Sequence, residues 1–414
     1  MRPATATLAF VESPVQLLNV LEWAHAPADP TVRTPAPAPV PTHTRTPTRT
    51  RTPTHAATPT PTHTPALDPA DDEPAEGRRT GRAGAGDDPA VPPAADGLTV
   101  VVLSPTDPMS RGQLRRMVQL ARDEGLTVRW QEARGGRGAL TRTLRALAPL
   151  LRGAERVVVG DPFSRYVQLL LTLFGPRHLT VVDDGTATME FAAQLARGER
   201  LVRWHRRGTR GPRELALAPV TALARRRLAP GRDRTVEIFT ALPVEPPPGT
   251  TVTANRFAWT RARFGPPRLT GGADLVGTSL VETGVVDADR YADAVAALAA
   301  AHGATRYFAH RRESVEKLHR IAVGTGLEIV RPDLPLELIA RRGPIGRTVV
   351  SFPSTVAHTL PLALAGTGIR IAVCDIAPEW LRESASPRAR GFLAGVAESA
   401  RTAHGLSLYG ATGV

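Results

Sequence analysis

Two adjacent carboxylates, Asp183 and Asp184, stand at the end of an apolar run and are followed by Gly185. The run, residues 178–182, has the length and composition of a buried strand. Ligands of an open α/β sheet bind outside the carboxyl ends of its strands, so a carboxylate placed there could act as a general base. Helix capping is the other interpretation: one aspartate would cap a helix expected over residues 189–197, and the other would be solvated.

His310 and Arg311 follow another apolar run, residues 305–309. An imidazolium at such a strand end can donate to a leaving phosphate and stabilise its developing charge. Arg311 would add positive potential at the same place. A polar loop residue without a chemical role is the competing interpretation of His310.

Ser354 and Thr355 stand between a strand expected over residues 347–352 and a helix expected over 356–365. Hydroxyls together with the free N–H groups of a helix N-terminus form an anion site. Ser354 could instead only cap the helix. Both this turn and the turn after His310 would reach one phosphate, so each strengthens the chemical interpretation of the other.

Two further residues could complete a nucleotide site. Gly277 ends the strand expected over residues 273–277 and would line the nucleotide pocket. Glu337, on a short helix expected over residues 334–341, could accept hydrogen bonds from ribose hydroxyls. A charge on the surface is the other interpretation of Glu337.

Ser13 and Gln16 open the first helix of the chain with the spacing of a capping box, and Pro14 stands at the first helical position. Capping explains the pattern fully. The turn nevertheless follows the first strand, residues 5–10, and therefore lies at the edge of the sheet where ligands bind.

The elements that must position these residues alternate between strand and helix, and the strands are apolar on both faces. This pattern predicts parallel sheets covered by helices, in an α/β fold with two Rossmann-like domains facing across a cleft. The boundaries are an N-terminal acceptor-side domain (1–26 and 98–235), a C-terminal nucleotide-binding domain (236–385) and a helical tail (386–414), with a proline-rich hinge at 243–249. The absence of a Gly-x-Gly-x-x-Gly motif and of a P-loop argues against dehydrogenases and kinases.

Residues 27–97 interrupt the fold with Thr-Pro repeats and a Gly/Ala/Pro-rich part. Proline at this density prevents helices and sheet ladders, and the segment has little apolar surface to offset chain entropy. We therefore predict a disordered low-complexity insertion. Its scattered histidines alternate with Thr-Pro and fix no metal-binding geometry, and no metal site is expected.

Composition excludes several classes. The single cysteine, Cys374, excludes a disulfide framework and a Cys-rich metal site. No apolar run approaches the roughly 18 residues of a membrane span, and the N-terminal segment lacks the apolar core of a signal peptide. A cytoplasmic protein is the expectation.

The net charge of +13 is concentrated between Arg203 and Arg234, which hold ten Arg residues. Such a run attracts anions, and a peripheral contact with the inner face of the membrane or an anionic acceptor is one interpretation. A solvated linker is the other. No nucleic-acid partner is expected because no nucleic-acid-binding motif is present.

Taken in order, Ser13-Pro14-Val15-Gln16, Asp183-Asp184-Gly185, His310, Glu337 and Ser354-Thr355 resemble one family. It comprises bacterial sialyltransferases of the lipooligosaccharide and capsule polysialyltransferase type, whose shared motifs are acidic-acidic-Gly, His-Pro and Ser-Ser/Thr. The resemblance extends from about residue 5 to 385 without the insertion. One departure is that Arg311, in place of proline, follows His310.

The resemblance implies a GT-B fold and inverting, metal-independent transfer of a sialic or related nonulosonic acid from a CMP-sugar to a hydroxyl of a cell-surface glycan. It implies that Asp183 or Asp184 is the general base, with Asp183 preferred as the first of the pair. It further implies that His310 assists departure of CMP and that Ser354 and Thr355 bind its phosphate. No cofactor is expected; the partners are the nucleotide sugar and the glycan acceptor.

Two other hypotheses fit the sequence. A GT-B glycosyltransferase or epimerase that uses a UDP- or GDP-sugar would have the same domains, and a panel of nucleotides would distinguish it. A non-catalytic surface or scaffold protein would have the Thr/Pro-rich insertion as its functional part, and activity of a chain without the insertion would argue against it.

Overall fold

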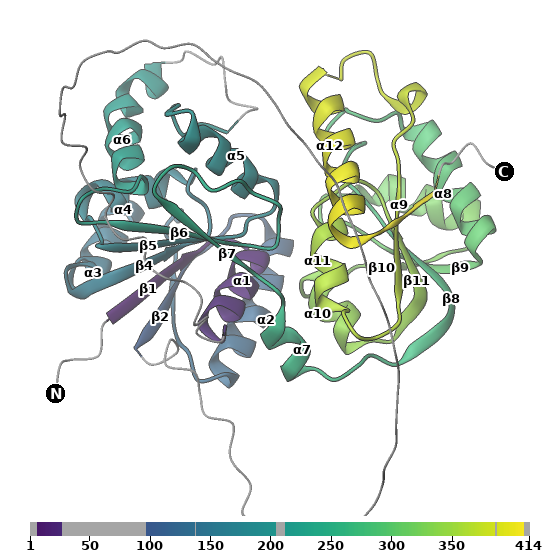
Figure 1. Ribbon diagram of the computed structural model, residues 1–414, viewed down its shortest axis with the longest axis horizontal. Helices are drawn as coiled ribbons and strands as arrows, with labels where there is room; N and C mark the ends of the chain where they lie inside the picture. The colour runs from purple at the N-terminus through teal and green to yellow at the C-terminus, as the bar shows by residue number, and fades with distance from the viewer. Residues whose placement is uncertain (1–5, 27–96, 137, 204–211, 386, 410–414) are drawn as a thin grey trace, which may run out of the picture. The chain divides into compact units, whose positions relative to one another are not determined.

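The computed structural model describes most of the chain outside the Thr/Pro-rich insertion (Figure 1). The described residues are 6–26, 97–136, 138–203, 212–385 and 387–409. The predicted disordered insertion, apart from Gly97, lies outside them. The chain leaves the first domain at Ala26 and re-enters it at Gly97, whose carbonyl accepts a hydrogen bond from the Thr7 N–H at 3.3 Å.

The first domain is built on a sheet in which seven parallel strands of the described chain are ordered β3-β2-β1-β4-β5-β6-β7. The strands are β1 (Ala6–Val11), β2 (Leu98–Leu103), β3 (Thr127–Gln131), β4 (Ala154–Val159), β5 (His178–Val182), β6 (Thr235–Thr240) and β7 (Thr250–Ala254). The order places β1, β4 and β5 side by side in the middle. Their carboxyl ends therefore meet at one edge of the sheet.

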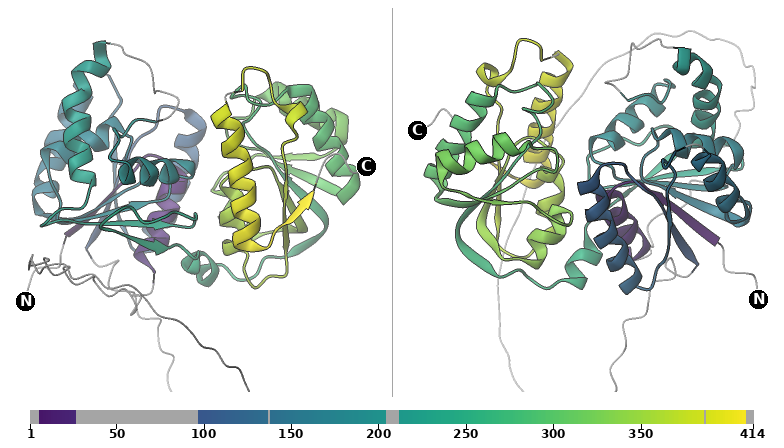
Figure 2. Two further views of the ribbon diagram at one scale, coloured as in Figure 1. Left: turned by 45° about the horizontal axis from the view of Figure 1, so that its top comes forward. Right: turned by 180° about the vertical axis from the view of Figure 1, so that it is seen from behind.

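Helices cover both faces of this sheet (Figures 1 and 2). They are α1 (Pro14–Ala24), α2 (Pro108–Asp123), α3 (Ala139–Gly153), α4 (Arg165–Leu173), α5 (Thr186–Ala196), α6 (Pro212–Leu228) and α7 (Ala258–Arg263). Because side chains alternate along a strand, Ala9 and Val11 of β1 pack against α1 and α2, whereas Leu8 and Phe10 belong to the core under α3, α4 and α5. This burial on both faces is why the strands read as continuous apolar runs.

The second domain repeats the arrangement. Its strands are parallel in the order β10-β9-β8-β11-β12-β13. They are β8 (Leu269–Val276), β9 (Ala304–Phe308), β10 (Glu328–Val330), β11 (Ile345–Ser351), β12 (Arg370–Cys374) and β13 (Ser407–Tyr409). Its helices are α8 (Ala288–His302), α9 (Val315–Thr325), α10 (Leu336–Arg342), α11 (Val356–Ala363), α12 (Pro387–His404) and a 3-10 turn at Pro378–Trp380. One core lies under α8 and α9, and another lies under α10 and α11.

Both sheets have the Rossmann-like strand order, so the predicted α/β class with two Rossmann-like, GT-B-like domains is confirmed. The two domains share apolar core, because Leu338 of α10 and Ala363 of α11 pack in the same cluster as α1 and α7. The helical tail predicted from residue 386 is confirmed as α12, and β13 then joins it to the second sheet by pairing with β12.

The predicted domain boundary at residue 236 is wrong. β6 and β7 pair with each other and with β5, so both belong to the first sheet. The proline-rich segment 243–249 connects these two strands instead of separating the domains. The sequence of β7, Thr-Thr-Val-Thr-Ala, carries little apolar signal because it is an edge strand. Without that strand, the position of the boundary could not be recognised.

The helix α1 carries a stripe of buried polar side chains that join other elements. The Asn19 Nδ2 donates to the Asp183 carbonyl at 3.1 Å, and its Oδ1 accepts from the Asn255 Nδ2 at 2.8 Å. The Glu22 carboxylate accepts from the backbone N–H groups of Trp259 and Thr260 at 3.1 and 2.9 Å, at the start of α7. These bonds tie the end of β5 to the segment that leads into the second domain.

Among the helices of the described residues, none is both long and apolar enough to cross a membrane.

Candidate functional site

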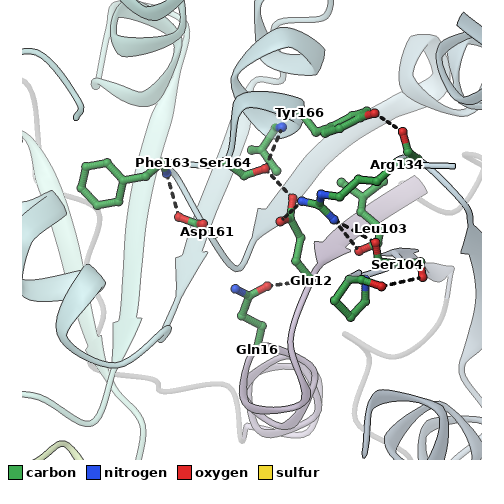
Figure 3. Close-up of polar contacts among 12 residues, drawn as sticks. Glu12, Gln16, Leu103, Ser104, Arg134, Asp161, Phe163, Ser164 and Tyr166 are labelled. Carbon is green, nitrogen blue, oxygen red and sulfur yellow. Dashed lines mark hydrogen bonds and ion pairs between the residues drawn. The ribbon is translucent and has the colours of Figure 1, made fainter. Parts of the chain in front are cut away.

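Four acidic residues follow the strands β1, β4 and β5 and therefore lie along the carboxyl edge of the first sheet: Glu12, Asp161, Asp183 and Asp184. Glu12 accepts hydrogen bonds from Ser164 Oγ and from the Arg134 guanidinium (Figure 3). Burial raises the pKa of Glu12, and Arg134 and Ser164 oppose the increase. The edge thus holds carboxylates that are withdrawn from water and paired with specific cations.

Asp184 and Asp161 share one guanidinium. The Arg203 Nη2 lies 3.1 Å from Asp184 Oδ2 and 2.9 Å from Asp161 Oδ2. The pKa of Asp184 is raised to about 6: burial and the Asp161 carboxylate raise it, whereas Arg203 and a hydrogen bond from Gln16 oppose the increase. A carboxylate with a pKa in this range is ionised at neutral pH and is a stronger base than an ordinary aspartate.

Asp183 has a different environment from its neighbour. It is 3% exposed, and its two carboxylate oxygens accept from the Thr240 hydroxyl at 2.5 Å and from the Ala241 N–H at 2.6 Å. Burial raises its pKa to about 6, against the effect of these hydrogen bonds. The Asp183 carboxylate therefore links the end of β5 to the end of β6, and both of its oxygens accept hydrogen bonds from that strand end.

Neither aspartate caps α5, because its N-cap is Gly185 and no side chain bonds to the cap, so the capping interpretation is wrong. Both oxygens of Asp183 hold hydrogen bonds within the protein, whereas the Asp184 side chain is 17% exposed. Asp184 is therefore the more accessible carboxylate, and the role of either aspartate as general base stays a prediction.

Ser13 caps the first helix, whereas the side chain of Gln16 contacts the acidic residues at the sheet edge. The Ser13 Oγ accepts from the Gln16 N–H at 3.3 Å, which confirms that Ser13 caps α1. The Gln16 Oε1 accepts from the Glu12 N–H at 2.7 Å, and its side chain also bonds to Asp184. Gly160, at the end of β4, lies so close to Gln16 that a Cβ there would collide with its amide. Gln16 is thus held beside the candidate base, and a binding role for Ser13 stays a prediction.

On the second sheet, the loop after β9 presents His310. Its Nδ1 accepts from the Arg312 N–H at 3.2 Å, which leaves Nε2 as the nitrogen that carries hydrogen in the neutral ring. The pKa of His310 is lowered to about 4, mainly by burial and also by the charges of Arg311, Arg312 and Lys317. At neutral pH His310 is therefore a neutral hydrogen-bond donor in the free protein, and its expected role at a leaving phosphate stays a prediction.

The Glu313 carboxylate holds the backbone of the His310 loop in place. Its carboxylate accepts from the His310 N–H at 2.6 Å, from the Tyr307 hydroxyl at 2.6 Å and from the Lys317 ammonium at 2.8 Å. A Cβ on Gly277 would collide with Glu313 and Tyr307. Gly277 therefore makes room for this buried network, and its role in lining a nucleotide pocket stays a prediction.

Ser354 and Thr355 follow β11, which pairs with β8 beside the strand that carries His310. The N-cap of α11 is Thr355, and no side chain bonds to the cap, so capping by Ser354 is wrong. Thr355 also faces the first domain: a Cβ on Gly185 would lie 3.4 Å from its Oγ1. Gly185 has φ +63°, a conformation that favours glycine. This backbone conformation and the close approach to Thr355 both favour glycine at this position.

Glu337 is 6% exposed, so the surface interpretation is wrong. Its Oε1 accepts from the Thr359 hydroxyl at 2.5 Å on the neighbouring helix α11, and burial raises its pKa. The Glu337 charge in turn raises the pKa of Asp183, so the two carboxylates lie within electrostatic range of each other. Binding of ribose by Glu337 stays a prediction.

Arg311 completes the edge of the second sheet. Burial lowers its pKa, whereas the carboxylates of Asp184 and Asp107 raise it. Asp107 caps α2, which starts beside α9: Met109 of α2 lines the same surface groove as Val315 of α9. Arg311 therefore faces the first domain, on the side where Asp184 lies.

The Arg-rich segment has an ordered part, although residues 204–211 lie outside the description. Residues 212–228 form α6, so the interpretation as a solvated linker is wrong there. Arg203 binds Asp161 and Asp184, and the Arg234 guanidinium donates to the carbonyls of Pro176, Arg226 and Ala229 at 3.3, 2.9 and 3.4 Å. Part of the excess charge thus serves the protein's own structure. A membrane contact stays a prediction.

Among the described residues, no group of three or more His, Cys, Asp and Glu side chains is arranged to hold a metal ion.

Sequence reasoning missed Glu12, Asp161 and Arg203. The first two were within reach of the rule that found Asp184, because each follows a buried strand. Arg203 carried no usable signal, since its partners are 42 and 19 residues away in the chain. Together these residues place carboxylates and a guanidinium at the edge of the first sheet, and the second sheet offers a neutral imidazole, a guanidinium and two hydroxyls.

No protein-family model and no curated protein matches the chain. Among solved structures, it is similar to an α/β-galactoside α-2,3-sialyltransferase from Photobacterium phosphoreum, with 10% identity over 77% of this chain and 92% of that chain and a TM-score of 0.40. It is also similar to MurG from Acinetobacter baumannii (12% identity, 77% and 80% covered, TM-score 0.30) and to a variant of Os79 from O. sativa in complex with UDP (13%, 74% and 84%, TM-score 0.30). Likenesses of this strength carry no conclusion about activity.

Proposed function

We propose that the chain is an inverting, metal-independent glycosyltransferase that moves a sialic or related nonulosonic acid from a CMP-sugar to a hydroxyl of a glycan. The observation that carries the proposal is the pairing of opposite chemistries on the two domains. Asp184, a carboxylate with a pKa of about 6, lies on the first domain, and it interacts with Arg311, the neighbour of His310 on the second. A base and an anion site that meet in this way are what a transfer from a phosphate leaving group requires.

In this mechanism Asp184 accepts the proton of the acceptor hydroxyl as the oxygen attacks the anomeric carbon. The bond from that carbon to the CMP phosphate oxygen breaks on the opposite side, which inverts the configuration. The electron pair of the broken bond goes to the phosphate. The His310 Nε2–H donates a hydrogen bond to that oxygen, and the hydroxyls of Ser354 and Thr355 and the start of α11 hold the phosphate.

The neutral state of His310 is compatible with this role. A neutral imidazole donates from Nε2 as long as Nδ1 accepts, and the Arg312 N–H maintains that arrangement. The negative phosphate would also favour the protonated ring, and so would raise the pKa of His310 from its value of about 4 in the free protein. The histidine would then strengthen its contribution as the leaving group forms.

The test is transfer or hydrolysis of CMP-N-acetylneuraminic acid by the purified chain. Asp184→Asn should lower turnover about 10²–10⁴-fold, the usual contribution of a general base, while CMP still stabilises the protein in a thermal shift. Glu155→Gln, which removes an exposed carboxylate from β4, is the matched control and should leave turnover unchanged.

Asp183→Asn distinguishes the two aspartates. Turnover that falls with Asp183→Asn but persists with Asp184→Asn would exchange their assignments. Stabilisation by UDP or GDP, with none by CMP, would favour a UDP- or GDP-sugar instead. A chain that binds no nucleotide and turns over no CMP-sugar would refute the proposed function and favour a non-catalytic role.

A further inference from the structure

Arg311 is a cation that the mechanism above does not use. It follows His310 directly, it is partly buried, and no hydrogen bond or ion pair joins it to any other residue of the described chain. The nearby Glu313 carboxylate does not pair with it, because Glu313 accepts from the His310 N–H and from Lys317. A partly buried guanidinium without a direct partner loses hydration, and an anion that completes its hydrogen bonds would offset that cost.

The surroundings of Arg311 define where such an anion would lie. On the second domain, His310 is the adjacent residue, and the β9 and β11 strands on either side of β8 bring the Ser354-Thr355 turn to the same edge. On the first domain, Asp184 and Asp107 interact with the guanidinium, and α2 is tied to the second domain by the Gln113 Nε2, which donates to the Pro332 carbonyl at 2.6 Å. Arg311 thus lies between the candidate base and the candidate phosphate site.

We propose that Arg311 binds the carboxylate of the donor sugar, and so selects a donor that carries an acid group on the carbon that reacts. The proposal rests on the proposed function. In a nonulosonic acid donor the carboxylate, the leaving phosphate and the line of attack all meet at one carbon. A cation between the base and the phosphate site is therefore next to the carboxylate. The guanidinium fork matches the two oxygens of that group.

A donor without the acid group leaves Arg311 unsatisfied. The anomeric carbon of a UDP- or GDP-hexose carries hydrogen in place of the carboxylate, and the partly buried guanidinium would then face the sugar without a partner. Discrimination of this kind is strong because the mismatched ligand leaves a buried polar group unpaired. The same residue would thus attract the acidic sugar and reject the neutral one.

The experiment compares ligands with and without the carboxylate in three proteins: wild type, Arg311→Gln and Arg347→Gln. For CMP-N-acetylneuraminic acid, Arg311→Gln should raise KM about 10- to 150-fold, the range expected for a lost hydrogen bond to a charged group. The inhibition constant of CMP, which lacks the sugar, should change less than about threefold on the same scale. Arg347→Gln removes the same charge from an exposed position of β11 and should alter neither value.

A second measurement uses the donor with its carboxylate converted to the methyl ester. Wild type should prefer the acid by about tenfold or more, and Arg311→Gln should lose that preference. Because the wild-type preference alone is informative, the inference stays testable if the variant does not fold. Equal weakening of CMP and donor in Arg311→Gln, or a wild type that binds ester and acid alike, would overturn it. Those outcomes leave CMP-sugar turnover intact and so differ from failure of the proposed function itself.

Discussion

Asp161 and Arg203 should move the pH dependence of activity in opposite directions. The proposed base, Asp184, has a pKa of about 6, and it must be ionised to act. Activity, measured as kcat/KM for CMP-sugar transfer, is therefore lost as pH falls through that value. Asp161→Asn removes a negative charge that favours the protonated form of Asp184, so the acid limb of the profile should move to lower pH.

The size of the movement follows from the shared guanidinium. Since Arg203 Nη2 lies 2.9 and 3.1 Å from the two carboxylate oxygens, these oxygens are at most about 6 Å apart. Two charges at that separation interact by about 3 kcal/mol at an effective dielectric constant of about 20, which corresponds to about two pH units. Both carboxylates are partly exposed and Arg203 screens their interaction. We therefore expect the acid limb of Asp161→Asn to move by about one pH unit.

The assay is kcat/KM for transfer between pH 4.5 and 8 for wild type, Asp161→Asn and Arg203→Met. Arg203→Met should move the limb to higher pH, because it removes the cation that stabilises ionised Asp184. Asp123→Asn, at an exposed end of α2, provides the control and should leave the limb in place. A limb that stays near pH 6 in Asp161→Asn, or that moves the same way in both variants, would refute the assignment of Asp184 as the titrating base.

Three further outcomes are expected. Because the pKa of Asp183 is raised in the folded protein, ionised Asp183 destabilises the fold; this cost is absent below about pH 4 and complete above about pH 6. Wild type should therefore lose about 3 kcal/mol of unfolding free energy, measured in urea, between pH 4 and pH 7, and Asp183→Asn should not show this loss. His310→Gln should retain more turnover than His310→Ala because an amide N–H can replace Nε2–H, and equal loss in both would argue against a hydrogen-bonding role. Gly277→Ala should lower the melting temperature by several degrees, because its Cβ would displace the Glu313 and Tyr307 side chains, and an unchanged melting temperature would contradict that contact.

The alternation of strands and helices was predictable because parallel strands buried on both faces leave apolar runs in the sequence. The same logic located Asp184, His310 and Thr355, since each follows such a run. The order of the strands within a sheet was not predictable, and it is this order that brings Asp161 beside Asp184. The choice between the two aspartates could not be made locally either, because it depends on the hydroxyl of Thr240, 57 residues from Asp183.

The protonation state of His310 could not be read from the sequence for a related reason. The pattern His-Arg-Arg suggests a positive loop, but whether the ring is charged depends on its burial and on the direction from which the Arg312 N–H approaches. The edge strand β7 and the Arg-rich helix α6 were missed because neither has the apolar period of its class. In both, long-range packing decides the structure.

The low-complexity segment joins the first domain at Ala26 and Gly97, and this has a practical meaning for protein engineering. The helix α1 starts at the carboxyl edge of the sheet and returns the chain to the amino edge, where Gly97 bonds to Thr7 at the start of β1. A helix and the next parallel strand need only about 2–6 residues between them. A short Gly/Ser linker should therefore close this junction, and a fluorescent protein or an affinity module placed there would sit at the opposite end of the strands from Asp184.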